Sequence, residues 1–318
     1  MKISAYDPRY RAEAAALFVR NFKQLRRAVP ALPDRLENAD EVASRLDNLV
    51  EQCPGVSAVE GDQLLGYLGW FIVDRFRGTD RKGAYAPEWG HATIDEHRQE
   101  IYRALYRTAA EQWSAAGCGV HAITLLAHDQ VAQQAWFWNG FGLTVVDAVR
   151  PMQPLNISSS TDLVVRKATL ADVNALAELD AEHWQHYTRA PIFMTPRASS
   201  TTDQFAEFLS RPKNSMWLVL DRETPIGLMR YGGYDFDGVA MVESDQTIGI
   251  TGAYVRPAYR GRKAAVTLLD VALRDYAARG FTCCTVNFES FNPEAATFWM
   301  KYFEPVGLSV VRIPENCP

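Results

Sequence analysis

The spacing of apolar and polar positions divides the chain into short strands and amphipathic helices, and the same order of elements occurs twice. In the first half, Asp7 as N-cap and Pro8 at the first helical position mark where the first helix begins. The pattern predicts a strand over 2–6, helices over 8–27 and 40–52, a hairpin of strands 56–60 and 64–74, a helix over 98–116, a strand over 120–127, a helix over 130–138 and a strand over 143–150. This order indicates a mixed α/β fold.

A segment rich in turn-forming residues follows this first series. Residues 151–160 hold two prolines, an asparagine and three consecutive serines, a composition typical of a linker. We therefore predict two domains, residues 1–155 and 156–318, in line with a prior of about 150 residues per domain.

After this segment the order of elements restarts. A strand is predicted over 163–167, and Thr169 with Asp172 forms a capping-box-like start to a helix that ends near Tyr187. The further predicted elements include strands over 247–255 and 282–288, with an apolar helix stripe between them that begins near Ala265 and stops at Gly280.

The two halves also align on one another at a constant separation and without gaps. Identical residues fall on a helix face, a helix end, a turn and the next helix, in the pairs Leu105/Leu268, Ala109/Ala272, Ala115/Ala278, Gly117/Gly280, Ala132/Ala295 and Trp136/Trp299, and Asp129 faces Asn292. Further upstream, the tripeptide that begins at Gly83 repeats the one that begins at Gly252. An internal duplication is the simplest explanation.

The composition is that of a globular protein. Of the 318 residues, 47% are hydrophobic and 22% are charged, and the formal net charge is -5. Because a clustered positive field is needed to attract them, we expect neither nucleic acid nor a membrane surface as a partner. No apolar run approaches the length of a membrane span and the N-terminus lacks a secretory signal, so we predict a cytoplasmic protein. The five cysteines include no CxxC pair and are expected to be reduced.

The main candidate for chemistry is a basic turn between the strand over 247–255 and the helix that follows. Pro257 ends the strand because it has no amide hydrogen to donate. The turn supplies three cations, a glycine and two small residues: Arg260, Arg262, Lys263, Gly261, Ala264 and Ala265. It lies at a helix N-terminus, where unpaired N–H groups and the helix dipole favour an anion. The turn therefore predicts a site for a phosphate or diphosphate group.

At this turn the sequence resembles the GNAT superfamily of N-acetyltransferases, whose acyl-CoA loop reads Arg/Gln-x-x-Gly-x-Gly/Ala after a strand that ends in Val-x-Pro. Val255, Pro257, Arg260 and Ala265 fit this pattern, whereas Lys263 stands where the family usually has a glycine. The resemblance implies two tandem GNAT-like α/β (α+β) domains, each a mixed, mostly antiparallel sheet flanked by helices. It also implies that the second domain binds acetyl-CoA as cosubstrate, with contacts from Tyr254, Val255, Arg260, Gly261, Arg262, Lys263, Ala264, Ala265, Asn292 and Trp299.

The first half lacks this basic turn. In its place, residues 86–96 carry three carboxylates and no arginine. Like charges would repel a diphosphate rather than hold it. We predict that the first domain keeps a degenerate GNAT-like fold without an acetyl-CoA site, which resembles tandem GNAT proteins with one active half.

The residues that would carry out the reaction follow less directly from the family. GNAT domains commonly have a proton-donating tyrosine seven residues after the asparagine, and Trp299 occupies that position relative to Asn292. Tyr302, one helical turn further, is the candidate proton donor, and the alternative is a tyrosine that only packs. The usual glutamate position of the family is Gly249 here. The open candidates for the base are Glu289, Glu243 and Asp245, each of which could instead be an ordinary solvated carboxylate.

The preferred function is acetyl transfer from acetyl-CoA to a primary amine of a small molecule or peptide, with the backbone N–H groups of Tyr254 and Val255 polarising the thioester carbonyl. The alternatives are a catalytically silent CoA-binding protein (a pseudoenzyme or sensor) and an interaction scaffold that binds no CoA. His183 and His186 have no third ligand near them in sequence, so we expect surface histidines and no metal. The acidic segment 234–245 is either an attractive surface for a cationic amine or a solvated hairpin. We expect a monomer or a homodimer.

Overall fold

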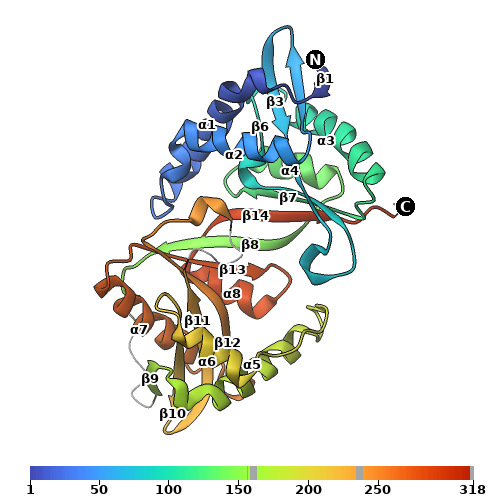
Figure 1. Cartoon of the computed structure of the whole chain (residues 1–318). Helices are drawn as coiled ribbons and strands as arrows, with labels where there is room; N and C mark the ends of the chain where they lie inside the picture. Colours follow the sequence, from blue (N-terminus) through green and yellow to red (C-terminus); the bar gives the residue numbers. More distant parts are fainter. Residues whose placement is uncertain (156, 158–162, 234–238, 316–318) are drawn as a thin grey trace.

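The computed structural model describes residues 1–155, 157, 163–233 and 239–315 (Figure 1). The first half builds β1 (Lys2–Ala5), α1 (Arg11–Ala28), α2 (Ala39–Gln52), β2 (Val56–Glu60), β3 (Gln63–Leu68), β4 (Phe71–Val73), β5 (Gly83–Ala86), β6 (His91–Thr93), α3 (Arg98–Ala115), β7 (Val120–Leu126), α4 (Gln130–Trp138) and β8 (Gly142–Pro151). Residues 156 and 158–160 of the predicted linker, the boundary between 155 and 156, and residues 234–238 of the acidic segment lie outside the described residues.

The second half repeats this order. It builds β9 (Leu163–Lys167), α5 (Val173–Tyr187), α6 (Thr202–Ser210), β10 (Ser215–Asp221), β11 (Thr224–Gly232), β12 (Thr247–Val255), α7 (Ala264–Ala278), β13 (Cys283–Glu289), α8 (Pro293–Tyr302) and β14 (Glu304–Arg312). The predicted capping box is confirmed: the Thr169 side chain accepts from the Ala171 amide, and the Thr169 amide donates to Asp172. Asp7 caps a short 3-10 turn that leads into α1.

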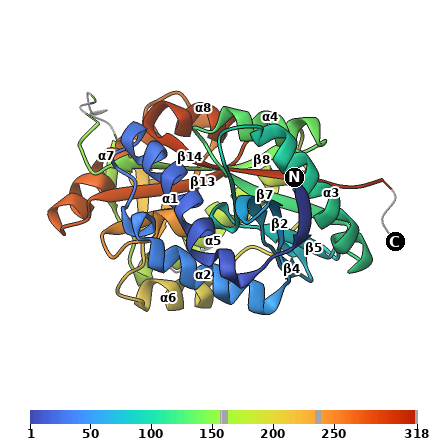
Figure 2. The ribbon, with the colours of Figure 1, turned by 90° about the horizontal axis from the view of Figure 1, so that it is seen from above.

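The strands within the described residues form two sheets. One has the order β1-β2-β3-β6, and the other has the order β4-β5-β7-β14-β8-β13-β12-β11-β10-β9. Neighbouring strands are antiparallel except at β5–β7 and β12–β13, which are parallel. Seen from above, α4 and α8 lie on one side of the central strands and α2 and α6 on the other (Figure 2). The predicted mixed, mostly antiparallel sheet with flanking helices is therefore confirmed.

The two halves exchange their last strands. β8, from the first half, pairs with β13 of the second half, and β14, from the second half, pairs with β7 of the first. β8 and β14 also pair with each other, and they run side by side across the middle of the molecule (Figure 1). One continuous sheet thus joins the two halves, and residues of the first half reach the second half's parallel strand pair.

The structural repeat follows the constant separation seen in the sequence. β7 and β13 begin and end at matching residues, and Asp129 and Asn292 cap the helices that follow by accepting from the amides of Ala132 and Ala295. The predicted match of Gly83 with Gly252 is wrong. Gly83 lies opposite the first residue of β7 and Thr247 opposite the first residue of β13, so these two positions are the counterparts.

A segment of the second half also packs into the first half's core. Met241 and Val242 are buried in the same apolar cluster as residues of α1 and α2. The Met241 amide donates to the buried Glu88 carboxylate at 2.9 Å, and Glu243 pairs with Arg35 and Arg45. Burial of apolar surface at about 25 cal/mol per Å² makes this insertion a main source of cohesion between the halves.

The described cysteines are free thiols. Cys283 packs in the cluster that contains α1, and Cys284 packs in the cluster that contains α7, on the opposite face of the sheet. Of the helices in the described ranges, none combines the length and the apolar character that crossing a bilayer requires.

Candidate functional site

The site is organised around a fork between two parallel strands of the second half. β12 and β13 pair from Thr247/Cys283 to Ile250/Val286 and then separate. Beyond the fork, β12 stays paired with β11 as far as Val255, and β13 stays paired with β8 as far as Glu289. Backbone groups on the facing edges of the two strands are therefore not used in pairing between them, as a ligand that enters the fork requires.

The basic turn closes the outer end of this fork. Gly261 and Lys263 both have left-handed backbones, with φ of 77° and 65°, and α7 begins at Ala264. A left-handed φ favours glycine because a Cβ crowds the following carbonyl. Lys263 therefore adopts the conformation for which the family pattern has a glycine, so the turn keeps its shape although the residue differs.

The arginines of the turn are held by different partners. Arg260 donates from Nε to the Val255 carbonyl at 3.1 Å, and its Nη1 lies 3.1 Å from Glu294 Oε1. Arg262 lies over the Tyr259 ring, 5.5 Å from its centroid. It does not line the cavity that is described in the next paragraph. Of the two, only Arg260 is placed beside the fork.

A cavity of about 1470 Å³ runs from this turn through the fork to the junction of the two halves. The predicted residues that line it are Tyr254, Val255, Arg260, Gly261, Lys263, Ala264, Ala265, Glu289, Asn292, Trp299 and Tyr302. The structure therefore brings together all of the predicted cofactor-binding residues except Arg262, together with Glu289 and Tyr302. The first half contributes further walls, among them Phe76, Arg77, Tyr85 and Asp147.

The helix α8 carries the asparagine and aromatic positions. Asn292 is buried and its side-chain oxygen accepts from the Ala295 amide at 3.2 Å, so it fixes the start of the helix. Trp299 is buried against Phe303, with ring centroids 5.4 Å apart. Tyr302 is half-buried, packs edge-on against Phe298 and lines the cavity. Of the two rings, Tyr302 is the one with an ionisable group in the cavity wall.

The three candidate bases occupy different environments. Glu289 lies in the cavity wall, where its Oε1 is 3.0 Å from Nη2 of Arg77 in the first half. Glu243 is in the interface described above, and Asp245 is exposed. Neither of these last two is among the cavity-lining residues, so Glu289 is the only one of the three that the fold brings to the fork.

The helix α5 forms the opposite wall. His183 is buried, which contradicts its predicted surface position, and it packs against Tyr187 and Tyr254. Burial and then the neighbouring His186 lower the pKa of His183 to about 3, so it is neutral at physiological pH. Trp184 also lines the cavity. This wall therefore presents the aromatic rings of His183, Trp184 and Tyr187 to the cavity.

Two buried carboxylates escaped the sequence analysis. Asp147 lines the cavity from the middle of β8, and Glu88 lies in the short 3-10 turn between β5 and β6. Burial and then the charge of Glu88 raise the pKa of Asp147 to about 8, and burial raises the pKa of Glu88 to about 7. The available signal was a lone acid in a strand that is otherwise apolar from Val145 to Val149.

The first half has a corresponding fork, and side chains close it. His91 on β6 spans the gap to β7, since its Nε2 donates to the Thr124 carbonyl at 2.9 Å and its Nδ1 lies 3.0 Å from the Tyr102 hydroxyl. Burial lowers the pKa of His91, in keeping with this neutral tautomer. Tyr102 and His91 both pack against Trp136.

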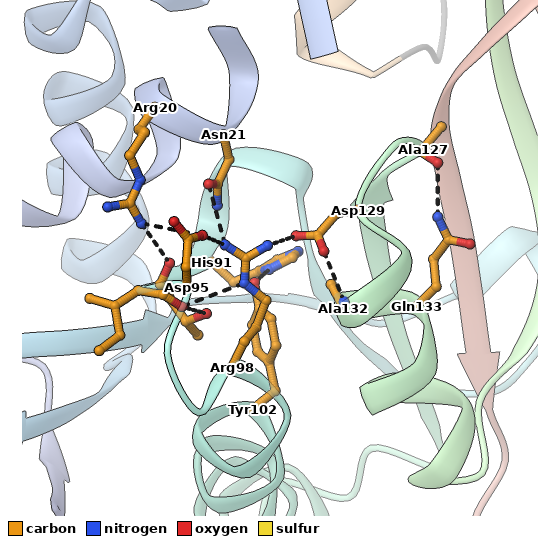
Figure 3. A network of polar contacts seen from close by, with 12 residues as sticks. Arg20, Asn21, His91, Asp95, Arg98, Tyr102, Ala127, Asp129, Ala132 and Gln133 are labelled. Atoms are coloured by element: carbon orange, nitrogen blue, oxygen red, sulfur yellow. Dashed lines mark hydrogen bonds and ion pairs between the residues drawn. The ribbon is translucent and has the colours of Figure 1, made fainter. Parts of the chain in front are cut away.

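An ion-pair network seals the same fork from the helix side (Figure 3). Arg98, the first residue of α3, donates from Nη1 to Asp129 at 2.5 Å, and its Nη2 contacts Asp95 and Asn21. Arg20 lies 3.8 Å from Asp95. Asp95 of the acidic stretch is thus paired with two arginines of the same half, while the buried Glu88 accepts from the Met241 amide of the second half.

Comparisons with known proteins agree with this geometry. Residues 176–303 match the acetyltransferase (GNAT) family, while no curated protein matches the sequence. A GCN5-related N-acetyltransferase from Sphaerobacter thermophilus has a TM-score of 0.60 at 14% identity, over 100% of this chain and 97% of that chain. The glucosamine N-acetyltransferase region of a fungal multi-domain GH3 beta-N-acetylglucosaminidase has a TM-score of 0.52 at 11% identity, over 98% of this chain and 38% of that chain. At these identities the likeness is one of fold.

Proposed function

We propose that this chain, which contains a GNAT acetyltransferase domain in residues 176–303, moves an acetyl group from acetyl-CoA to a primary amine of a small molecule or peptide. The observation that carries the proposal is the single cavity that joins the basic turn, the fork and the junction of the halves. Its volume of about 1470 Å³ exceeds the roughly 300–1,000 Å³ of sites for one small ligand. A reaction between two substrates needs such a space.

We propose the following roles for the residues at the acetyl-CoA end of the cavity. The α7 N-terminus, Arg260 and Lys263 would hold the diphosphate, and the small Ala264 and Ala265 would let it approach the backbone. Asn292 and Trp299 would contact the pantetheine arm. The backbone N–H groups of Tyr254 and Val255, on the edge of β12, would polarise the thioester carbonyl.

Two further residues would take part in proton transfer. Tyr302 would protonate the departing thiolate, since Trp299 has no acidic proton to give. Glu289 would act on the amine side, although its pairing with Arg77 favours a role in positioning. Much of the acceleration needs neither residue, because holding amine and thioester in attack geometry supplies roughly 7–11 kcal/mol in favourable cases.

The proposed domain organisation follows from the two forks. Residues 1–155 and 156–318 would be the two units, joined by strand exchange, and only the second would bind acetyl-CoA. The competing function is a CoA-binding protein without catalysis, and it is favoured by the tryptophan at the tyrosine position and by the ion-paired Glu289.

Turnover of acetyl-CoA with a panel of amines separates these two functions, with free thiol as the readout. We expect Tyr302→Phe to reduce turnover by about 10² or more with nearly unchanged acetyl-CoA affinity, because general acid catalysis contributes about 10²–10⁴. Trp299→Phe should instead weaken binding more than it slows the reaction. Binding of acetyl-CoA without thiol release for any amine would establish the non-catalytic function.

A further inference from the structure

One carboxylate in the cavity comes from the half that lacks the acetyl-CoA turn. Asp147 lies in the middle of β8, directly opposite Asn287 of β13 and Gly307 of β14. Gly307 leaves it room, since a Cβ there would lie 3.3 Å from Asp147 Cβ. Burying a charged side chain in a central strand costs several kcal/mol unless the charge is compensated. The presence of an acid at this position therefore needs an explanation.

Asp147 also lies beside the fork. The last paired residues of β12 and β13 are Ile250 and Val286, and Asn287 is the next residue along β13. Neighbouring strands are about 4.8 Å apart, so the strand position of Asp147 is one strand spacing from the point where the fork opens. Residues opposite one another share a face of the sheet, and both Asn287 and Asp147 line the cavity.

In the described part of the chain, Asp147 has another acid beside it, and none of the groups that interact with it is a cation. It accepts a hydrogen bond from the Val239 backbone, and Glu88 and Tyr85 face it from the neighbouring segments. The other carboxylates of the cavity have partners: Glu289 has Arg77, Glu294 has Arg260, and Asp180 accepts from the Ser200 amide. The positive charge of Arg45 lowers the pKa of Glu88, against the larger effect of burial. Asp147 therefore has no guanidinium partner of the kind that Glu289 and Glu294 have among the described residues.

We propose that Asp147 binds the ammonium group of the acceptor and takes its proton, so that the first half supplies the base for a reaction whose cosubstrate is held by the second. This inference rests on the proposed function. It names the substrate class as a primary amine that carries a positive charge in solution, with a body that fits among the aromatic side chains that line the cavity, Trp184 and Tyr187 of the second half and Phe76 and Tyr85 of the first.

Asp147 and the departing thiolate together account for both protons that the amine loses. Asp147 takes one proton from the ammonium, and the neutral nitrogen attacks the thioester carbonyl carbon. The C–S bond breaks with its electron pair on sulfur, and the second proton lost by nitrogen ends on the thiolate. A base is most effective when its pKa is near the working pH, and Asp147, with a pKa of about 8, meets that condition.

Titration of the protein with amines tests the ammonium site without relying on catalysis. The probes are 2-phenylethylamine, tyramine and tryptamine, with 2-phenylethanol as the uncharged control, titrated at about pH 8.5, where carboxylate and ammonium are both substantially charged. We expect Asp147→Asn to weaken amine binding about tenfold or more and to leave 2-phenylethanol unchanged. The matched control is Asp270→Asn, a buried acid that does not line the cavity. Equal amine affinity of wild type and Asp147→Asn, or no amine binding to either, would overturn the inference.

Kinetics then test the base. We expect Asp147→Asn to lower kcat/KM for the amine by about 10² or more with unchanged acetyl-CoA affinity. Glu88→Gln should shift the acid limb of the kcat/KM profile to lower pH, because it removes the like charge beside Asp147; a purely structural role would not move it. If wild type acetylates an amine and Asp147→Asn retains its rate, the inference fails alone. If the amine binds but no acetyl group is transferred, the proposed function fails and the ammonium site stands.

Discussion

At matching positions of the two forks, Arg98 and Tyr102 occupy the first half where Gly261 and Ala265 occupy the second. The tyrosine and arginine meet His91 and Asp129 across the gap and fill it. The glycine and alanine leave the gap open, and the cavity begins there. His97 and Lys263, the N-caps of α3 and α7, both have left-handed backbones, although they are not at positions related by the constant separation of the two halves.

The shared fold does not by itself determine whether a fork is open or closed. Both halves have a parallel strand pair, a helix that begins beside it and a capped helix after it. The first half fills this space with a buried aromatic and ionic cluster, which contributes stability, and the second half leaves it open as part of the cavity. The following variants test that division of roles.

The largest effect is expected from Arg98→Ala. It leaves the Asp129 carboxylate buried without its guanidinium, and breaking a buried pair in this way costs about 3–5 kcal/mol. Urea denaturation measures the loss. The double variant Arg98→Ala with Asp129→Asn should be more stable than Arg98→Ala alone, because no buried charge is left over. A single variant as stable as wild type would show that the network does not hold the first fork closed.

The second fork is tested by Arg260→Ala, which should weaken acetyl-CoA binding by about 10- to 100-fold through loss of a charge-assisted hydrogen bond of roughly 1.5–3 kcal/mol. Calorimetric titration gives the affinity. Glu294→Gln is the matched control, because it removes the carboxylate that now pairs with Arg260 and should leave affinity equal or higher. Unchanged affinity in Arg260→Ala would contradict the assigned turn.

A pH dependence should mark the acids at the junction of the halves. Glu88 and Asp147 have raised pKa values of about 7 and 8, so the folded chain keeps their protons to a higher pH than the unfolded chain does. Their contribution to stability is full below the ordinary pKa of a carboxyl group and is lost as the pH rises through 7 and 8, by up to about 1.4 kcal/mol per pH unit for each acid.

Unfolding of wild type and of the Glu88→Gln, Asp147→Asn double variant between about pH 5 and 8.5 measures this. The free energy of unfolding should fall with rising pH more steeply in wild type than in the double variant. Parallel curves would mean that the two acids are not held in the protonated form.

The smallest effect concerns the left-handed N-caps of α3 and α7. Lys263→Gly and His97→Gly should each stabilise the chain by up to about 1 kcal/mol, because glycine adopts a left-handed φ without the clash of a Cβ. Lys263→Val should destabilise it. Thermal denaturation of the three variants is sufficient, and a loss of stability in both glycine variants would show that the side chains, and not the turn, set these positions.

Most of the elements, and the residues that line the basic-turn end of the cavity, could be predicted from the sequence because they depend on local signals. The periodic apolar stripe of α7 and the caps at Thr169 and Asn292 are written in short stretches of sequence. The GNAT resemblance, read from a turn of a few residues, is confirmed by the family match and by the fold.

The remainder depends on pairing between distant segments. The exchange of β8 and β14 has no local signature, because a strand's pattern specifies which face is buried and not which neighbour it has. The match of Gly83 with Gly252 failed for a related reason: three identical residues carry less information than the register against β7. Asp147 enters the cavity only through the strand exchange, and so the amine end could not be located in advance.

The proposed function requires that only the second fork binds acetyl-CoA. The number of acetyl-CoA molecules bound per chain tests that requirement. Calorimetric titration of the whole chain should saturate at one acetyl-CoA per chain, and Arg260→Ala should weaken that same site. Arg98→Ala with Asp129→Asn, which loosens the first fork, should leave the stoichiometry at one. Two equivalents in wild type, or none, would contradict the assignment of the closed and open halves.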